Sequence, residues 1–455
     1  MSLQKSKKKI HFIGIGGAGM SGLADILTEM GHKVSGSDRE MSETTKYLQS
    51  RGITIFEGHA AENVSGVDLI VYSSAVPKEN PEMTQANKDN IPMIRRAEML
   101  GQLMMKKEGI AIAGTHGKTT TTSMTGQLLI DAGLDPTVVV GGKMQNLQTN
   151  ARLGSGKYFV TEADEYDRSF LALHPGISVI TSLEEDHLDI YKGLEDLKKT
   201  FLKFANQTMF DGASILCADE KNVAELAHKI NTPTTTYGLG SEADIQAQNI
   251  RFENGKTWFD LSVKGIQKGE FEIKLPGNHN ISNALASITV GLELGISLSV
   301  IKESLATFKG VQRRFEFKGE AAGILFYDDY AHHPSEVSAA LNAAKSGWQN
   351  NIVVVFQPHL FSRTSDFYKE FAESLKIADK VILAKIYPAR EKPMQGITSQ
   401  LIANEIGSKV EYIAENEKLT DAICASVKKG DLVLTMGAGD IWKFGEEALK
   451  RIKNV

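Results

Sequence analysis

Residues 109–121 read Gly-Ile-Ala-Ile-Ala-Gly-Thr-His-Gly-Lys-Thr-Thr-Thr, and this stretch decides the fold of the chain around it. Its first half is short, apolar and bounded by glycine, which is typical of a buried strand. Its second half contains Gly-Lys-Thr and continues into a run of threonines, which indicates a phosphate loop followed by a helix. A strand, a glycine-rich loop and a helix in this order predict a nucleotide-binding α/β domain.

The residues of this loop suit a bound phosphate and a cation. Backbone N–H groups can cradle phosphates, the Lys118 ammonium can neutralise their charge, and the Thr119 hydroxyl can complete a magnesium coordination sphere. The loop is shorter than the general Walker pattern, because Ile112 stands where that pattern has a glycine. The predicted phosphate-binding residues are Gly114, Thr115, His116, Gly117, Lys118, Thr119 and Thr120.

A second glycine-rich loop lies near the N-terminus. The apolar run 10–13 leads into Gly-Ile-Gly-Gly-Ala-Gly at 14–19, and apolar residues at helical spacing follow. This pattern predicts a site for a dinucleotide or a nucleoside diphosphate, and the motif by itself favours NAD. A further predicted strand ends at Asp38, where a carboxylate can reach ribose hydroxyls. The predicted substrate-binding residues are Gly16, Gly17, Ala18, Gly19, Met20 and Asp38, with Ser73 and Ser74 after the apolar run 69–72.

Short apolar runs alternate with longer helical patterns along the whole chain, which is typical of α/β architecture built on parallel sheets. A new series of strands and helices begins after Gln-Arg-Arg-Phe at 312–315, so we expect three domains, at 1–107, 108–312 and 313–455. Residues 241–275 alternate polar and apolar positions, which predicts a small antiparallel part in the middle domain. The predicted strands include 10–13, 69–72, 110–113, 158–161, 177–181, 352–356, 381–384 and 432–435.

Two clusters of acidic residues follow predicted strands, at 161–167 and at 181–189. Ligands bind at the carboxyl ends of parallel strands, so these clusters are candidates for chemistry. Carboxylate oxygens suit magnesium, whereas a histidine nitrogen is an unusual ligand for that ion. Because a phosphate loop requires a cation, we expect a metal site built from these clusters.

Composition excludes several classes of protein. The 455 residues carry 51 Lys and Arg against 56 Asp and Glu, so no basic field is available to hold nucleic acid. No run approaches the roughly 18 apolar residues that a membrane span needs. The apolar stretch after the basic N-terminus breaks at once into glycines, unlike a signal peptide. We therefore expect a cytoplasmic protein with no nucleic-acid or membrane partner, either a monomer or a homodimer.

Further motifs occur in a characteristic order along almost the whole chain. They are His11–Leu23, Gly114–Thr121, Glu162–Glu165, Asp186-His187, Gly277–Asn280, Gln312–Glu316, Asp328–Pro334 and Gln357–His359. In this order they resemble the ATP-dependent Mur ligases of bacterial cell-wall synthesis, and among them the enzymes that add L-alanine to UDP-N-acetylmuramate. The shortened phosphate loop is a feature that this family is expected to have.

The resemblance implies a fold and a reaction. It implies a Rossmann-like domain for the uridine nucleotide, a central P-loop ATPase, and a Rossmann-like C-terminal domain that receives the amino acid. The first loop would then hold the UDP moiety of the substrate, which disfavours NAD. ATP with Mg²⁺ or Mn²⁺ would phosphorylate the muramate carboxylate, and the amine of L-alanine would attack the acyl phosphate.

The resemblance also implies roles for individual residues. Lys118 would contact the transferring phosphate and Thr119 the magnesium, while Glu162 and His187 would form the metal-binding pair. The residues similar to the family's adenine-contacting segment are Asn278, His279 and Asn283.

In the C-terminal domain, Arg314 resembles the arginine that reaches the γ-phosphate, and Asp328 resembles the acid that meets the ATP ribose or phosphates. Arg363 is similar to an arginine that pairs with the carboxylate of the amino acid. His333 and the preceding histidine flank the same region. Leu360 departs from the family pattern, which often has arginine there, and leaves the construction of the amino-acid pocket open.

Several alternatives remain open at the level of sequence. Asn278 and Asn283 could cap a helix over 281–294, since Asn is a favoured cap. His332 and His333 could be surface imidazoles in a turn before Pro334. A recycling ligase that attaches a preformed peptide to the same nucleotide is a close rival for the function. An NAD-binding oxidoreductase or a nucleotide-dependent switch is a rival from another class.

Overall fold

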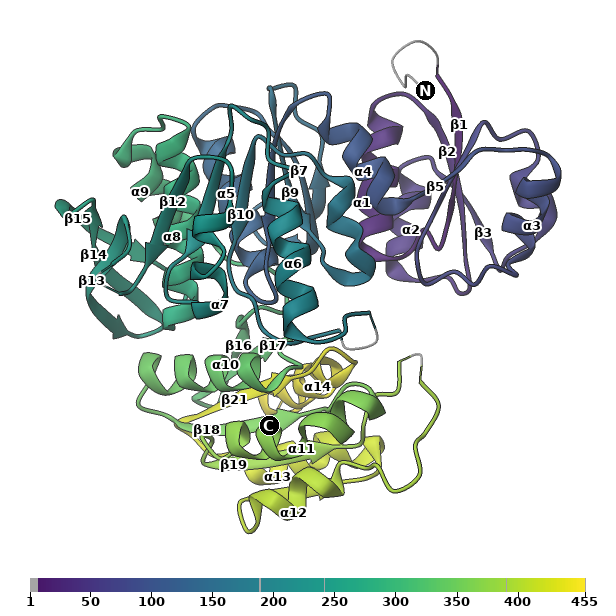
Figure 1. The fold of residues 1–455 in the computed structure, drawn as a ribbon. Coiled ribbons are helices and arrows are strands. Elements are labelled where there is room, and N and C mark those ends of the chain that lie inside the picture. Colours follow the sequence, from purple (N-terminus) through teal and green to yellow (C-terminus); the bar gives the residue numbers. More distant parts are fainter. Residues whose placement is uncertain (1–6, 188–189, 241, 390, 455) are drawn as a thin grey trace. The chain divides into compact units, whose positions relative to one another are not determined.

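The computed structural model describes residues 7–187, 190–240, 242–389 and 391–454, and it contains three β-sheets (Figure 1). The chain forms two compact units, and each is described by itself. The first unit contains 1–247, 262–268 and 282–305, and the second contains 248–261, 269–281 and 306–455.

The N-terminal sheet is parallel and five-stranded, in the order β3-β2-β1-β4-β5. The order reverses direction between β1 and β4, and ligands bind at such switch points in open α/β sheets. The strands are β1 Lys9–Ile13, β2 Lys33–Asp38, β3 Thr54–Glu57, β4 Leu69–Tyr72 and β5 Met93–Arg95. The helices are α1 Ala18–Glu29, α2 Glu43–Ser50, α3 Pro81–Lys88 and α4 Arg96–Met104.

The second sheet has ten strands, in the order β15-β14-β13-β12-β11-β10-β6-β9-β7-β8. Pairing is parallel from β13 to β7 and antiparallel between β7 and β8. Its strands are β6 Glu108–Ala113, β7 Thr137–Met144, β8 Thr149–Arg152, β9 Tyr158–Ala163, β10 Ile177–Ile180, β11 Ala213–Cys217, β12 Thr234–Gly238, β13 Ile245–Glu253, β14 Lys256–Val263 and β15 Ile266–Ile273. Its helices are α5 Lys118–Asp131, α6 Leu194–Ala205, α7 Lys221–Ala224, α8 Asn278–Glu293 and α9 Leu298–Thr307.

Two tight turns join β13, β14 and β15. Asn254-Gly255 and Lys264-Gly265 all have positive φ, between 48° and 78°. Two-residue loops with positive φ at both positions are type I′ hairpin turns, which connect antiparallel strands. The antiparallel part that alternation predicts over 241–275 is therefore present.

Helices α1 and α4 lie between the two sheets of the first unit (Figure 1). Helix α1 packs against β7 and β8 as well as against its own domain. The approach is close, because a methyl group on Gly22 would lie 2.9 Å from the Cβ atom of Ala151. The Asn150 side chain, in β8, also donates to the Ala18 carbonyl, at the start of α1, at 2.8 Å. The two glycine-rich loops therefore belong to one packed body.

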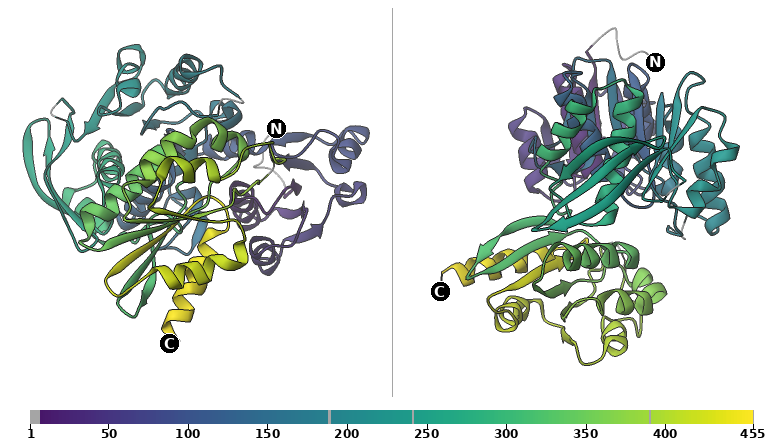
Figure 2. Two further views of the ribbon diagram at one scale, coloured as in Figure 1. Left: turned by 90° about the horizontal axis from the view of Figure 1, so that it is seen from below. Right: turned by 90° about the vertical axis from the view of Figure 1, so that its left-hand side faces the viewer.

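The second unit contains a six-stranded sheet in the order β16-β17-β21-β18-β19-β20. All pairs are parallel except β16 with β17. Separate hydrophobic clusters cover its two faces, one with α10, α11 and α12 and the other with α13 and α14 (Figure 2). The elements are β16 Glu316–Ala321, β17 Ile324–Asp329, β18 Asn351–Phe356, β19 Lys380–Ala384, β20 Val410–Ile413, β21 Asp431–Met436, α10 Pro334–Gly347, α11 Phe361–Leu375, α12 Gln400–Ile406, α13 Leu419–Ser426 and α14 Ile441–Lys453.

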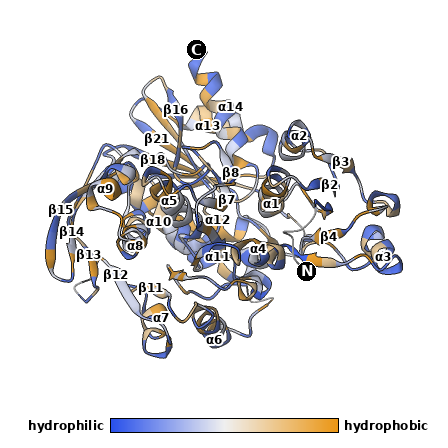
Figure 3. Ribbon diagram, turned by 90° about the horizontal axis from the view of Figure 1, so that it is seen from above, coloured by the Kyte–Doolittle hydropathy of each residue, from blue (hydrophilic) through white to orange (hydrophobic). Residues whose placement is uncertain are grey.

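The structure confirms the α/β fold class and all eight quoted strands. Hydrophobic residues gather on the strands and on one side of many helices, as periodicity predicts (Figure 3). Within the described residues, no helix combines the length and the hydropathy that crossing a membrane requires.

Candidate active site

The phosphate loop joins the end of β6 to the start of α5. Gly114 has φ +143° and Gly117 has φ +83°, backbone conformations that favour glycine. A methyl group on Gly114 would overlap the Thr181 hydroxyl, and one on Gly117 would lie 2.5 Å from Asn283 Oδ1. The two glycines therefore allow both the turn and the close approach of its neighbours.

Residues that follow β10 hold the loop from one side. The Thr181 hydroxyl donates to the Ala113 carbonyl at 3.1 Å, and the His116 N–H donates to Ser182 Oγ at 2.8 Å. Strands β6 and β10 are parallel neighbours, so their carboxyl ends meet at one edge of the sheet. Hydrogen bonds from the residues after β10 therefore hold the loop at this edge.

Lys118 is the first residue of α5, and its ammonium lies at the centre of this edge. It contacts Glu165 Oε1 at 2.8 Å and donates to the carbonyls of Gly114 and Thr115. Burial lowers the pKa of Lys118, but the carboxylates of Glu165 and Asp164 outweigh burial, so the pKa lies above its usual value. The lysine is therefore a permanent positive charge, as binding a phosphate requires.

Acidic and imidazole groups surround this charge. Glu162, in β9, accepts from the Gly141 N–H at 2.5 Å, and His187 Nε2 lies 3.8 Å from Glu165 Oε1. Glu165 Oε2 is buried and has no hydrogen-bond partner among the described residues, so an oxygen ligand is available there. The carboxylate oxygens are ligands that suit a hard divalent cation, whereas the imidazole of His187 is a less usual one. Asp189 of the second acidic cluster lies outside the described residues.

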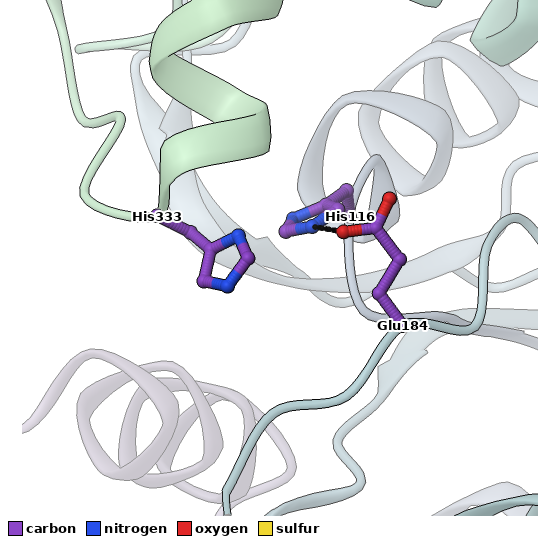
Figure 4. Close-up of side chains that lie close together, drawn as sticks. All are labelled: His116, Glu184 and His333. Carbon is purple, nitrogen blue, oxygen red and sulfur yellow. Dashed lines mark hydrogen bonds and ion pairs between the residues drawn. The ribbon is translucent and has the colours of Figure 1, made fainter. Parts of the chain in front are cut away.

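His116 and Glu184 form a further pair at the same edge. His116 Nε2 lies 3.2 Å from Glu184 Oε2, with the two side chains projecting from neighbouring loops (Figure 4). Burial raises the pKa of the nearby Glu220, and repulsion from Glu184 adds to the shift. The third residue in that figure, His333, belongs to the second unit and is described with it.

Asn283 connects the loop to a distant part of the chain. Its Oδ1 accepts from the Thr121 hydroxyl at 3.1 Å, and the side chain is buried. Helix α8 begins at Asn278, earlier than the helix over 281–294 that the capping interpretation requires, so Asn278 and His279 form its first turn. The structure thus places Asn283 beside the phosphate loop.

The first glycine loop is closed by β2. Asp38 Oδ2 accepts from the Gly16 N–H at 2.7 Å, and the Ser37 carbonyl accepts from the Gly14 N–H at 2.9 Å. Ser73 also lies beside the loop, because a methyl group on Gly14 would be 3.6 Å from its Cβ atom. The structure therefore brings together Gly16, Asp38 and Ser73, which the sequence assigns to one site.

A buried carboxylate supports the first loop. Glu82 is fully buried, and its oxygens accept from Ser37 at 2.6 Å and Asn63 at 2.7 Å, with His59 at 3.2 Å and His11 at 3.6 Å. Burial raises the pKa of Glu82, but His11, Ser37 and Asn63 outweigh burial and lower the pKa to about 2. Because Ser37 also receives the Gly14 N–H, this network holds the strand that supports the loop.

In the second unit, Asp328 lies at the carboxyl end of β17, and Arg314 lies just before β16. Asp328 is 1% exposed, accepts from Thr435 at 2.6 Å and pairs with Arg313 at 3.0 Å. Burial raises the pKa of Asp328, although Arg313 opposes that shift. Arg314 lies 3.7 Å from Glu336, and its guanidinium lies over the ring of Tyr330.

Two histidines before α10 and Arg363 at the start of α11 belong to the same unit. The side chain of His332 is half-buried, at 22% exposure, and its desolvation lowers its pKa to about 4. His333 immediately precedes α10, is largely buried, and contacts Ser335 Oγ at 2.7 Å, so neither histidine is an ordinary surface imidazole. Arg363, in the first turn of α11, lies 3.5 Å from His359. Leu360, which precedes that helix, has φ +70° and is mostly buried.

Three domain families match the chain. Residues 9–108 match the "Mur ligase family, catalytic domain", 112–291 the "Mur ligase middle domain" and 313–439 the "Mur ligase, glutamate ligase domain". The chain belongs to the Mur ligase family. It is therefore an ATP-dependent ligase, which requires ATP and a divalent metal ion.

Named relatives of this Mur ligase are similar over nearly their whole length. UDP-N-acetylmuramate--L-alanine ligases from Geobacter sulfurreducens and Geobacter sp. (strain M21) are 50% and 49% identical, and each alignment covers 98% of both chains. A UDP-N-acetylmuramate-alanine ligase structure from Thermotoga maritima is 31% identical, with a TM-score of 0.85 over 98% of this chain and 99% of that one. A murein peptide ligase from Psychrobacter arcticus is 26% identical over 98% of this chain and 99% of that one, with a TM-score of 0.72.

Sequence reasoning did not single out some residues of this Mur ligase that the structure places at its loops. They include Glu165, which pairs with Lys118, and Glu82, which supports the first loop. Glu165 lies in the acidic cluster 161–167, so its position after a strand was an available signal. Glu82 carries no comparable signal, because its partners come from three separate segments, β1, β2 and the connection between β3 and β4.

Proposed function

We propose that this Mur ligase joins L-alanine to the carboxylate of UDP-N-acetylmuramate, with conversion of ATP to ADP and phosphate, in the synthesis of peptidoglycan precursors. The observation that carries the proposal is the likeness, at about 50% identity over 98% of both chains, to enzymes named for this reaction. Among the solved structures, the likeness to the UDP-N-acetylmuramate-alanine ligase, at 31% identity and a TM-score of 0.85, exceeds the likeness to the murein peptide ligase, at 26% and 0.72. Domain boundaries at 1–107, 108–312 and 313–455 belong to the same proposal.

The two glycine loops divide the substrates between them. We assign UDP to the first loop, with Gly16, Gly17, Ala18, Gly19, Met20, Asp38, Ser73 and Ser74 as its contacts. The N-terminus of α1 offers N–H groups to the diphosphate. We assign ATP to the second loop, where Gly114 to Thr120 surround the phosphates and Lys118 neutralises them. Asn278, His279 and Asn283 are assigned to adenine.

The reaction converts a poor electrophile into a good one. The muramate carboxylate attacks the γ-phosphorus of ATP, ADP leaves, and an acyl phosphate forms. The amine of L-alanine then attacks the acyl carbon, and the tetrahedral intermediate collapses with loss of phosphate and a proton. Lys118 stabilises negative charge that develops during phosphoryl transfer.

The metal and the C-terminal residues complete the proposal. Thr119, Glu162 and His187 would hold Mg²⁺, or Mn²⁺ in its place, and the ion would neutralise the phosphate oxygens. Arg314 would contact the γ-phosphate and Asp328 the nucleotide. Arg363 would pair with the carboxylate of L-alanine, with His333 beside it.

The first test measures phosphate release from ATP in the presence of UDP-N-acetylmuramate, with L-alanine, glycine, L-serine or a tripeptide as acceptor. Release that depends on both the nucleotide sugar and L-alanine supports the proposal. Release only with the tripeptide would identify a recycling ligase instead. Release that is indifferent to the sugar and to every acceptor would indicate a nucleotide-dependent switch.

A further inference from the structure

Arg96 connects helix α4 to the acidic cluster 161–167, whose residue Asp164 directly follows β9. It is the first residue of α4, and its Nη2 atom donates to Asp164 Oδ2 at 3.1 Å. Asp164 itself is fixed, because its Oδ1 accepts from the Tyr166 N–H at 3.1 Å. The ion pair therefore holds the guanidinium in a defined place between two loops.

The same guanidinium lies against the first glycine loop. A methyl group on Gly19 would be 2.9 Å from Arg96 Nη1 and 3.3 Å from Cζ. The absence of a side chain at Gly19 is therefore what allows the cation to approach the backbone here. With Nη2 on Asp164, Nη1 faces the glycine at the start of α1.

The electrostatic setting favours an anion at this point. Helix α1 has no acidic residue in its first turn, and its N-terminal N–H groups carry partial positive charge. The side chain of Arg96 is 26% exposed, so its charge is partly desolvated and yet reachable by a ligand. An arginine has five N–H donors in a planar fork, so it can bind Asp164 and a phosphate at once.

We propose that Arg96 is a further substrate-binding residue, whose Nη1 atom donates to the diphosphate of the nucleotide sugar while Nη2 stays on Asp164. This inference rests on the proposed assignment of UDP to the first loop. Arg96 would also connect the two loops. Asp164 is the neighbour of Glu165, which pairs with Lys118, so Arg96 links the sugar-nucleotide loop to the ATP loop through side chains.

The chain provides a matched control in the preceding residue. Arg95 pairs with Asp167 at 3.1 Å, the same distance as Arg96 with Asp164, and the pair joins the same two domains. Arg95 is more exposed, at 54%. Removing Arg95 therefore removes an equivalent surface ion pair without removing a cation from the loop.

The test is calorimetric titration of the full chain and its variants with UDP-N-acetylmuramate, UDP and UMP. Arg96→Ala is expected to weaken UDP binding by about tenfold or more, which is about 1.4 kcal/mol, with a smaller loss for UMP. Arg95→Ala is expected to change UDP affinity by less than about twofold. Asp164→Asn, which breaks the ion pair but keeps the guanidinium, is expected to retain UDP affinity within about threefold.

The outcomes separate this inference from the proposed function. Equal losses in the Arg96, Arg95 and Asp164 variants would overturn it, because domain packing would then control binding. Unchanged UDP affinity in Arg96→Ala, with tight binding by the unaltered protein, would overturn it as well. Failure of the unaltered protein to bind UDP-N-acetylmuramate would count against the proposed function itself.

Discussion

The two glycine loops of this ligase have the same local order of strand, loop and helix but are stabilised in different ways. The second loop carries its own cation, Lys118, and a buried carboxylate lies against it at 2.8 Å. The first loop carries no charged residue from Gly14 to Gly19, and it is closed by the Asp38 carboxylate on a backbone N–H. Strand β2 supports this loop, because the Ser37 carbonyl accepts from the Gly14 N–H and the Ser37 hydroxyl donates to the buried Glu82.

Under the proposed assignment of ATP and UDP, one backbone pattern serves two chemical tasks. A loop that assists phosphoryl transfer needs a fixed positive charge where negative charge develops. A loop that only holds a diphosphate can use backbone N–H groups and a helix N-terminus. The predictions below test whether the loops are separable in this sense, from the largest expected effect to the smallest.

The largest effect is expected for Lys118→Ala. Loss of the ammonium should lower kcat by about 1,000-fold, the size typical of a deleted transition-state contact, and leave UDP-N-acetylmuramate affinity nearly unchanged. Phosphate release measures kcat, and calorimetry measures the affinity for UDP-N-acetylmuramate.

Gly16→Ala should have the converse effect. Its added methyl group would lie 2.8 Å from Asp38 Oδ2, so the variant should bind the nucleotide sugar more weakly and bind ATP as before. Equal loss of both ligands in either variant would show that the loops are not separable.

The second prediction concerns the buried support of the first loop. Glu82 has its pKa lowered to about 2 from 4.5, so its stabilising contribution is present above pH 4.5 and is lost as the pH falls towards 2. Glu82→Gln should lower the free energy of unfolding at neutral pH by roughly 3 kcal/mol. It should also remove part of the pH dependence between 4.5 and 2, as measured by urea unfolding. A variant with an unchanged pH profile would contradict the ionised state of Glu82.

The third prediction compares equivalent glycines that precede the two helices. Gly117 has φ +83°, whereas Gly17 has φ −63° and leaves 3.5 Å to the nearest atom that an added methyl would meet. Gly117→Ala should cost about 2 kcal/mol of stability, from the left-handed backbone and the crowding against Asn283. Gly17→Ala should cost less than about 0.5 kcal/mol. Chemical unfolding of the ligand-free variants gives both values, and similar costs would refute the difference between the loops.

The smallest loss of stability is expected for substitutions in α5, the helix that follows the second loop. Thr121→Val removes the hydroxyl that donates to Asn283 and should cost about 1 kcal/mol. Thr122 is its matched control, because its hydroxyl is buried without a hydrogen-bond partner in the described part of the chain. Thr122→Val should therefore be neutral or stabilising in the same unfolding experiment. The reverse order would mean that Asn283 does not anchor this helix.

Much of the fold was predictable from local sequence. Apolar runs of strand length specify the eight quoted strands, and positive-φ glycines specify the loops, because periodicity and backbone sterics act within a few residues. The ordered motifs resemble those of the Mur ligases, and this resemblance extended the prediction from the fold to the reaction. Lys118, Thr119, Glu162 and His187 were its candidate residues for binding phosphate and metal.

What only the tertiary structure decided is which distant side chains meet. Glu165 lies 47 residues from Lys118, Asn283 lies 162 residues from Thr121, and Asp164 lies 68 residues from Arg96. No local pattern encodes these pairs. They form because parallel strands place their carboxyl ends at one edge of a sheet, and because α1 and α4 pack two sheets into one body. The sequence by itself determined the strands and the glycine-rich loops, whereas the tertiary topology determined which distant residues hold each loop in place.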